Sequence, residues 1–377
     1  MSTSVYVHFP WCLQKCPYCD FASATIRRPE VPHVAYADAV LRELELRAGA
    51  GLSGPLASVF FGGGTPSLWE PRELGRVLRA IRAAFGAETA ELEVTVECNP
   101  SSLDAERAAG LFEAGVNRLS IGVQSLDAAR LRFLGRLHDG PGALAALRAA
   151  LAHVPRVSAD LMFGMPDQSP ADFLAELSQV LELGLRHVSV YALTIEPETR
   201  FGELARKGKL PLAKDDAYAD TFLATEALLA AHGFEHYEVS NYAQPGQTSR
   251  HNQHYWRGGD YLGLGTAAVG CVGKRRYKNQ TRPQAYLDAA DLPAIEQESE
   301  SLDARAIVQE GLMLGLRTSE GVSLRELEAR AGIDPRRGRE RALARRFERG
   351  QLALEGDRLR VPHAHWLQLD GIVSDLF

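Results

Sequence analysis

The first half of the chain alternates short strand-like segments with longer helical patterns, and this alternation limits the possible fold more than any other feature. Strands are expected over Val5–Phe9, Ser58–Phe61, Leu92–Glu97, Asn117–Val123, Val157–Phe163 and His187–Tyr191. Helices are expected over 34–46, 74–85, 104–114, 128–134, 142–152 and 171–183, where apolar residues recur at helical spacing. The pattern is typical of parallel βα units, because each parallel connection has to cross over the sheet.

Polar or glycine-rich residues follow the ends of these strands. They are Cys12–Cys19, Gly62–Thr65, Glu97, Gln124 and Asp160. Ligands of parallel sheets and barrels bind at the carboxyl ends of the strands, so we expect these residues around one mouth. A barrel and an open doubly wound sheet produce the same alternation, and the pattern leaves both possible.

The alternation loosens after about residue 200. We expect a helix over 215–231, a strand over 236–239 and a polar loop around Ser249–Asn252. The composition changes again near 283–293, and helices over 302–316, 323–331 and 338–349 with a hairpin over 352–361 predict a small winged-helix-like unit. The predicted domains are therefore 1–200, 201–293 and 294–377.

The composition is that of an ordinary globular protein, with 45% hydrophobic and 24% charged residues. It excludes a disordered chain, and the net charge of −6 argues against a protein that coats nucleic acid, so no nucleic-acid partner is expected. The arginine-rich segment 336–349 is expected to be a solvated or partner-docking face. No signal peptide and no apolar run of ~20 residues is visible, so we expect a cytoplasmic location with at most peripheral membrane contact.

The cysteines are the most specific chemical signal. Cys12, Cys16 and Cys19 fall within one short loop directly after the first strand, while the other two cysteines stand alone. Sulfur ligands suit both iron–sulfur clusters and zinc, but a structural zinc site normally has four protein ligands, and no second pair follows here. Three thiolates on a four-iron cluster would leave one iron free for another ligand.

Several segments together resemble the radical SAM superfamily, and more narrowly its HemN/HemW branch of coproporphyrinogen dehydrogenase-like proteins. The segments are Tyr6–Cys12, the Cys-x3-Cys-x2-Cys loop, Gly62–Pro66, Glu97–Pro100, Arg118–Gln124 and Asp160–Pro166. The resemblance covers most of the chain. It implies an α/β fold, with a partial (β/α)6 barrel, an α+β extension and the C-terminal unit, that holds a [4Fe–4S] cluster and S-adenosylmethionine (SAM).

The resemblance also implies roles for individual residues. Cys12, Cys16 and Cys19 would hold the cluster. The residues around SAM would be Tyr6, Tyr18, Gly63, Gly64, Thr65, Glu97, Gln124, Arg136, Asp160 and Ala192. Taken singly, a triple glycine is more often a turn and a lone Glu97 or Gln124 a solvated strand end; their joint order after successive strands favours the functional interpretation.

Two departures separate the members of this branch. The coproporphyrinogen dehydrogenase type has a fourth cysteine shortly after the third, where this chain has Phe21, and it has an N-terminal extension, whereas the motif here begins at Tyr6. Both differences are typical of HemW, a haem-binding, chaperone-like relative. The HNxxYW segment that starts at His251 resembles the haem-binding segment of that type. His251 is the predicted haem ligand and His254 the competing one, while a locally hydrogen-bonded histidine is the plainer alternative.

The sequence therefore predicts a haem chaperone that binds a [4Fe–4S] cluster, SAM and haem and passes haem to acceptor proteins. An electron donor for the cluster is an expected partner. The alternatives are an oxygen-independent coproporphyrinogen III oxidase and a radical SAM methyltransferase of the same branch. No catalytic residue is assigned, and the oligomeric state and any need for SAM cleavage are left open.

Overall fold

The first half of the chain forms the parallel part of a large open sheet. The computed structural model describes residues 2–52, 54–87, 91–211 and 215–377. The parallel strands are β1 (Thr3–Phe9), β4 (Leu56–Gly63), β5 (Glu93–Cys98), β6 (Arg118–Gln124), β7 (Arg156–Phe163) and β8 (His187–Ala192). They lie side by side in chain order. A doubly wound sheet would reverse its strand order, so the arrangement is that of a barrel.

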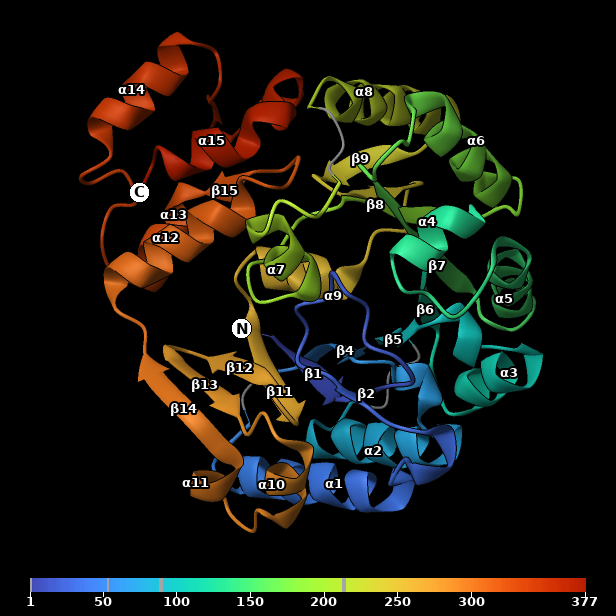
Figure 1. Ribbon diagram of the computed structural model, residues 1–377. Coiled ribbons are helices and arrows are strands. Elements are labelled where there is room, and N and C mark those ends of the chain that lie inside the picture. The colour runs from blue at the N-terminus through green and yellow to red at the C-terminus, as the bar shows by residue number, and fades with distance from the viewer. Residues whose placement is uncertain (1, 53, 88–90, 212–214) are drawn as a thin grey trace.

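Helices cover the outer face of these strands (Figure 1). They are α1 (His33–Gly49), α2 (Pro71–Ala84), α3 (Ala105–Glu113), α4 (Ala128–Phe133), α5 (Gly140–His153) and α6 (Pro170–Leu181). Apolar side chains of both layers are buried in the core. Val5, Val94 and Leu119 are fully buried, and each such side chain contributes roughly 2 kcal/mol by leaving water. The six strands and six helices expected from the sequence are confirmed, with ends that differ by a few residues.

Further strands extend the sheet at both edges. Among the described residues these edges do not pair with each other, so the barrel is partial. On one side β11 (Asp260–Gly265) pairs parallel with β1 and continues through β12 (Val269–Val272), β13 (Arg275–Asn279) and β14 (Glu296–Ser301). On the other side β10 (Asn241–Ala243) and β9 (Glu235–Glu238) follow β8. The order runs from β14 at one edge to β9 at the other, and the twelve strands do not close on themselves in the described part of the chain.

Short elements connect these strands. They are β2 (Trp11–Cys12), β3 (Ala24–Thr25), α7 (Arg200–Arg206), α8 (Asp215–Ala231), α9 (Arg250–Trp256), α10 (Pro283–Asp288), α11 (Leu292–Ile295) and the 3-10 turns η1 (Arg28–Glu30), η2 (Pro66–Leu68) and η3 (Pro100–Ser102). The prediction of a polar loop around Ser249–Asn252 is wrong, because α9 begins there. Ser249 caps this helix by accepting the backbone N–H of Asn252.

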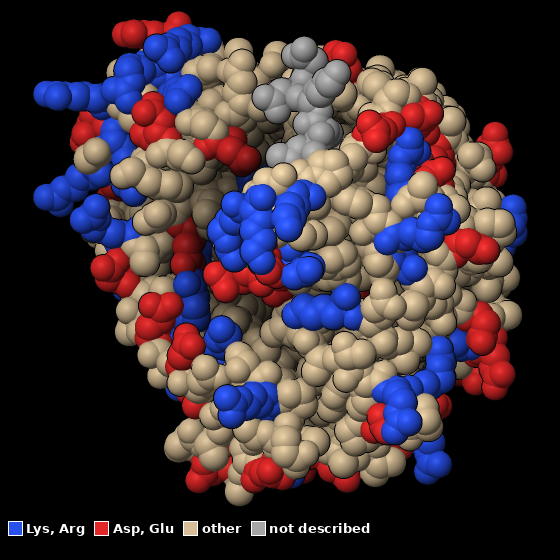
Figure 2. Space-filling model, in the orientation of Figure 1, with Lys and Arg blue, Asp and Glu red and all other residues tan. Residues whose placement is uncertain are grey.

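The C-terminal unit has the three expected helices and a small sheet. Its elements are α12 (Ala304–Gly315), α13 (Leu324–Ala331), α14 (Glu340–Glu348), α15 (Leu369–Ser374), the 3-10 turn η4 (His363–Gln368) and the strands β15 (Val322–Ser323), β16 (Ala353–Glu355) and β17 (Arg358–Arg360). Figure 2 shows basic side chains gathered over α14, where Arg345 and Arg346 pair with Asp375.

The predicted division into three domains stays a prediction. Its second boundary, between residues 293 and 294, falls inside α11, and the large sheet continues through β14 to Ser301. Every helix in the described ranges is too short or too polar to cross a lipid bilayer.

Candidate functional site

A cavity of about 340 Å³ lies at the carboxyl ends of the parallel strands. The predicted residues that line it are Cys12, Cys16, Tyr18, Cys19, Gly63, Gly64, Thr65, Glu97, Gln124, Arg136 and Asp160. Most come from the loop after β1 and from the ends of β4, β5 and β6, which is the mouth that the parallel order predicts. Asp160 lies within β7, and Arg136 follows α4. The fold therefore brings together side chains that are up to about 150 positions apart in the sequence.

The cysteine loop is closed by local backbone pairing. Strands β2 and β3 pair in parallel on either side of it, and the N–H of Cys19 donates to the carbonyl oxygen of Cys16 at 3.2 Å. Burial raises the pKa of the Cys12 thiol, and it raises the pKa of Cys19 to about 11. A thiolate in this loop therefore needs a cationic partner, which an iron ion supplies.

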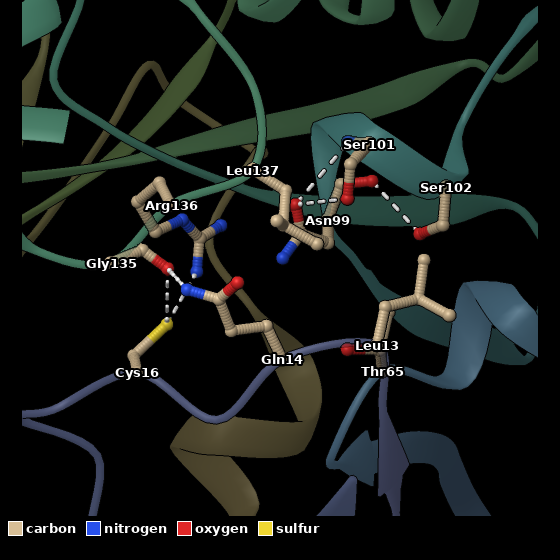
Figure 3. Close-up of a pocket in the computed structure, with 10 residues that line it drawn as sticks. All are labelled: Leu13, Gln14, Cys16, Thr65, Asn99, Ser101, Ser102, Gly135, Arg136 and Leu137. Atoms are coloured by element: carbon tan, nitrogen blue, oxygen red, sulfur yellow. Dashed lines mark hydrogen bonds between the residues drawn. The ribbon is translucent and has the colours of Figure 1, made fainter. Parts of the chain in front are cut away.

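Two donors approach the sulfur atoms from other elements. The hydroxyl of Thr65 donates to Sγ of Cys12 at 3.3 Å, and Nη1 of Arg136 donates to Sγ of Cys16 at 3.6 Å. Figure 3 shows Arg136 beside Cys16, with Gly135 accepting a hydrogen bond from Gln14. Hydrogen-bond donors and a guanidinium charge beside the sulfur atoms suit a sulfur-ligated metal cluster.

The glycine turn after β4 is tightly constrained. Gly63 has a φ of +105°, and a Cβ built on it would lie 2.6 Å from the ring of His8. A Cβ on Gly64 would lie 2.6 Å from the carbonyl oxygen of Trp11. Close packing against His8 and Trp11 therefore requires glycine at both positions, and the turn also lines the cavity.

Two carboxyl groups face the cavity from β5 and β7, on either side of β6. Oε2 of Glu97 accepts the N–H of Gly63 at 3.1 Å, and Asp160 accepts the hydroxyl of Ser120 at 3.1 Å. Burial, with the negative charge of Asp160, raises the pKa of Glu97 to about 7, and burial also raises the pKa of Asp160. Both carboxyl groups are therefore prepared to accept a ligand that brings positive charge or hydroxyl donors.

Gln124 occupies a strained backbone position at the end of β6. Its φ is +65°, in the left-handed region that non-glycine residues rarely adopt, and the pairing of β6 with β7 shifts register beside it. Strain of this kind is found preferentially at functional sites. The neighbouring Gly122 accepts a hydrogen bond from Nη2 of Arg136 at 2.5 Å, which links this strand end to the cysteine loop.

The sequence reasoning did not identify several other residues that line the cavity, among them Ser120, Met162 and Tyr191. The signal for Ser120 was present, since residues 120, 122 and 124 alternate with the buried Leu119, Ile121 and Val123 along β6. Side chains two apart on a strand share one face, so this alternation points the polar set toward the cavity.

Two of the predicted SAM residues do not line the cavity. The hydroxyl of Tyr6 is 3.1 Å from Nδ1 of His8, and its ring stacks on Phe60 with centroids 6.2 Å apart. Ala192 ends β8, next to Tyr191, which does line the cavity.

The predicted haem ligand His251 is buried beneath the first turn of α9, with 8% of its surface exposed. Its Nδ1 is 2.8 Å from the hydroxyl of Ser58, and its ring stacks on Phe60 with centroids 4.9 Å apart. Burial lowers its pKa to about 4, so the imidazole is neutral at pH 7. A neutral imidazole is the form that ligates iron, although a macrocycle reaches this ring only if α9 moves away from β4.

The competing histidine is also engaged. Nε2 of His254 is 2.8 Å from the carbonyl oxygen of Asp260, which can only accept, so Nε2 carries the proton. Tyr255 is 39% exposed, and its ring meets Tyr261 edge to face at 5.2 Å. The outer side of α9 therefore offers flat aromatic surface close to a histidine.

Comparisons with known proteins agree with this geometry. Residues 6–180 match the model of the radical SAM superfamily, and residues 302–367 match the HemN C-terminal domain. The chain is 43% identical to the heme chaperone HemW of Escherichia coli K12 over 71% of this chain and 70% of that protein. It is 36% identical to HemW of Mycobacterium tuberculosis H37Rv over 99% of this chain and 94% of that protein.

Among solved structures, the coproporphyrinogen III oxidase HemN of Escherichia coli shares the fold. The TM-score is 0.82 at 22% identity, and the match covers all of this chain and 90% of HemN. The agreement extends the likeness to the C-terminal unit and to the open sheet. The chain therefore belongs to the HemW family, in the HemN/HemW branch of the radical SAM superfamily.

Proposed function

We propose that the chain binds a [4Fe–4S] cluster through Cys12, Cys16 and Cys19 and binds SAM in the adjoining cavity. The observation that carries this proposal is the shared cavity, which joins three thiols to the glycine turn and to two half-buried carboxyl groups. The residues fit both groups, because the thiols need a cation and the carboxyl groups need donors or positive charge. When bound, such a cluster supplies the electron for reductive cleavage of SAM.

The surrounding residues have separate tasks in this proposal. Arg136 and Thr65 hold the sulfur atoms by hydrogen bonds and lower the energy of their thiolate forms. The backbone of Gly63 and Gly64 lines the cavity, where the methionine part of SAM would lie against it. Glu97 would accept a hydrogen bond from the ammonium group or from ribose hydroxyls of SAM.

Iron and sulfide analysis after anaerobic reconstitution tests the cluster. We expect the intact chain to hold four iron and four sulfide, as a [4Fe–4S] cluster requires. Cys19→Ser should lose the cluster. The control is Cys271→Ser, because Cys271 is 8% exposed and belongs to a distant part of the sheet. Equal iron content in the two variants would contradict the proposal.

We also infer that haem is the cargo and that the chain transfers it to acceptor proteins, with a reductant protein serving the cluster. The relatives named heme chaperone HemW support this inference, as does the exposed aromatic surface of α9. His251 remains the predicted ligand of the haem iron, with His254 as its competitor. Ligation by His251 requires α9 to separate from β4, because that histidine is buried.

Haem titration of matched variants tests the ligand. His251→Ala should weaken haem binding by at least about tenfold if its imidazole coordinates iron. Ser58→Ala is the matched control, because it removes the same buried hydrogen bond and leaves the imidazole in the chain. Equal loss in both variants would mean that the position of α9, and not the imidazole, governs haem binding. Loss in His254→Ala alone would assign the competing ligand.

A coproporphyrinogen oxidase activity is the alternative that the same preparation tests. The HemN match supports the fold and does not extend to the reaction. Phe21, which replaces the fourth cysteine, lines the cavity and is 56% exposed. We expect no turnover of coproporphyrinogen III by the reconstituted chain with SAM and a reductant. Decarboxylated product would overturn the assignment as a chaperone.

A further inference from the structure

A second group of metal-ligating side chains lies at the β9 edge of the sheet, remote in sequence from the cysteine loop. It consists of Glu226 from α8, His236 from β9 and His363 from η4, and their ligand atoms all lie within 4.8 Å of one another. Two consecutive elements, α8 and β9, and the distant η4 therefore bring two imidazoles and one carboxylate to one point. None of the three lines the cavity beside the cysteine loop.

His236 is oriented before any ion arrives. Its Nε2 is 3.1 Å from the carbonyl oxygen of Val239, and a carbonyl can only accept, so Nε2 carries the proton. The lone pair of Nδ1 then faces the group. A metal-ligating histidine typically donates its second ring N–H to a carbonyl in this way, because the contact fixes the tautomer and the direction of the ring.

The distances suit a small divalent ion. Nδ1 of His236 is 3.0 Å from Nε2 of His363 and 3.8 Å from Oε1 of Glu226. Ligands of a tetrahedral zinc ion, with bonds of about 2.0–2.1 Å, are separated by about 3.3 Å. These two separations lie on either side of that value, and Nδ1 of His363 contacts Oε1 of Glu226 at 2.5 Å. Small side-chain rotations that open this contact would seat the ion.

The surroundings combine a rigid inner side with an open outer side. The side chain of His236 is only 4% exposed; its ring stacks on Tyr242 at 3.9 Å and meets the ring of Trp366 at 4.4 Å. The side chain of His363 is 43% exposed, and its Nδ1 lies 2.5 Å from Glu226. Solvent therefore reaches the group from the side of His363, which gives an ion an entry path and leaves room for water as a fourth ligand.

We propose that Glu226, His236 and His363 form a binding site for one Zn²⁺ ion that fastens the C-terminal unit to the edge of the barrel. A site of two histidines and one glutamate with water in the fourth position is an established zinc coordination set. The ion joins η4 to α8 and β9, and so it controls how firmly the end of the chain is held against the sheet. This inference is independent of the proposed cluster, SAM and haem.

The test measures binding of Zn²⁺ to the full-length chain in a background in which Cys12, Cys16 and Cys19 are replaced by serine, because those thiols also bind zinc. We expect one Zn²⁺ per chain and a rise in Tm on binding. Glu226→Gln and His363→Ala should each weaken binding by at least about tenfold and abolish the rise in Tm. His232→Ala is the matched control, since this histidine directly follows α8 and its Nδ1 bonds to the carbonyl of Leu228, away from the proposed site.

Co²⁺ serves as a second probe, because its spectrum reports the ligand type. Bound at this site, it should show the visible bands of a tetrahedral ion without thiolate charge-transfer absorption. The Tm of each metal-free variant shows that it is folded, and Glu226→Gln provides an independent arm should His363→Ala fail to fold. Absence of Zn²⁺ binding in the serine background, or unchanged affinity in both ligand variants, would overturn the proposal and leave a hydrogen-bonded ion pair only.

Discussion

At the scale of single residues, the cavity combines groups that are costly to ionise with backbone that only glycine can form. Glu97 is the clearest case, because burial and the charge of Asp160 raise its pKa to about 7. Raised pKa values of this kind cluster at functional sites, where a ligand later supplies the missing partner. In the chain without cluster or SAM, ionisation of Glu97 should therefore lower the free energy of unfolding.

Glu97→Gln tests that cost through the pH dependence of stability. The folded pKa is raised above the unfolded value of 4.5, so the stabilising contribution of the protonated form is present below pH 4.5 and is lost as the pH rises through 7. Glutamine keeps the acceptor for the N–H of Gly63 and does not ionise. Between pH 5 and pH 8, urea unfolding should show the variant gaining about 2 kcal/mol relative to the native chain.

If the difference in free energy of unfolding between Glu97→Gln and the native chain is the same at pH 5 and pH 8, the carboxyl group of Glu97 is paired or solvated.

Gly63→Ala tests the constraint at the glycine turn. The left-handed φ and the overlap of a Cβ with the ring of His8 should together cost about 2–4 kcal/mol in the free energy of unfolding. Gly184→Ala is the matched control, because Gly184 has a similar φ of +82° and a Cβ there would meet no atom within 4 Å. The control should lose only about 1 kcal/mol. Equal losses in both variants would show that the space beside Gly63 is not restricted.

At the scale of elements, the parallel strands and the helices between them follow from local pattern, whereas α9 depends on a distant side chain. The carboxylate of Glu93, on β5, accepts the N–H of Arg250 at 3.1 Å and the N–H of His251 at 2.9 Å. These are free donors of the first turn of α9, so Glu93 caps this helix from another element. Sequence reasoning expected a polar loop here because that cap is 157 positions away.

Glu93→Gln tests this anchor. The carboxylate also pairs with Arg156 at 2.6 Å, and the nearby arginines with the two N–H donors lower its pKa despite burial. The carboxylate of Glu93 stabilises the fold above pH 4.5, which is its pKa in the unfolded chain. This contribution is lost as the pH falls through the lowered pKa of the folded chain. At pH 7 we expect a loss of about 3 kcal/mol and faster amide exchange across 250–256.

The control for this anchor is Glu91→Gln, because Glu91 contributes only its backbone carbonyl to Arg250. It should leave stability and exchange unchanged. Normal protection of 250–256 in Glu93→Gln would show that α9 forms without the carboxylate.

The edge strands show a second limit of prediction from sequence. The strand β14 has the sequence Glu-Gln-Glu-Ser-Glu-Ser and is mostly exposed, so it lacks the apolar alternation that signals a strand. It forms because β13 supplies a partner for its backbone. The cavity shows the same limit. The order of the glycine turn, Glu97 and Gln124 at the ends of successive strands predicted that these residues share one mouth. Tyr191 also lines the cavity, but its place there depends on the curvature of the sheet, which no local pattern encodes.

At the scale of the whole molecule, a buried polar network ties the first helix to the extension of the sheet. Arg47 of α1 bonds to Glu43 at 2.7 Å, to Asn279 of β13 at 3.0 Å and to Glu296 of β14 at 3.0 Å. Glu43 also accepts the N–H of Gly265 at 2.8 Å. The network joins segments more than 200 residues apart, so the extension and the barrel should unfold together.

Arg47→Met tests that coupling. The change leaves the fully buried carboxylate of Glu43 without its cation, which should cost about 3–5 kcal/mol. Arg27→Met is the control, because Arg27 is 81% exposed and its pair with Glu30 lies at the surface; we expect less than about 0.5 kcal/mol there. Denaturant unfolding should remain a single transition in the native chain. A separate early transition for the extension would contradict the coupling.

The central claim is that three sulfur ligands hold an iron–sulfur cluster whose remaining iron is free to bind SAM. The most direct measurement is the electron paramagnetic resonance spectrum of the anaerobically reconstituted, reduced chain before and after addition of SAM. Coordination of SAM to the free iron should change the cluster signal in the native chain. An intact cluster signal that does not respond to saturating SAM would contradict the account.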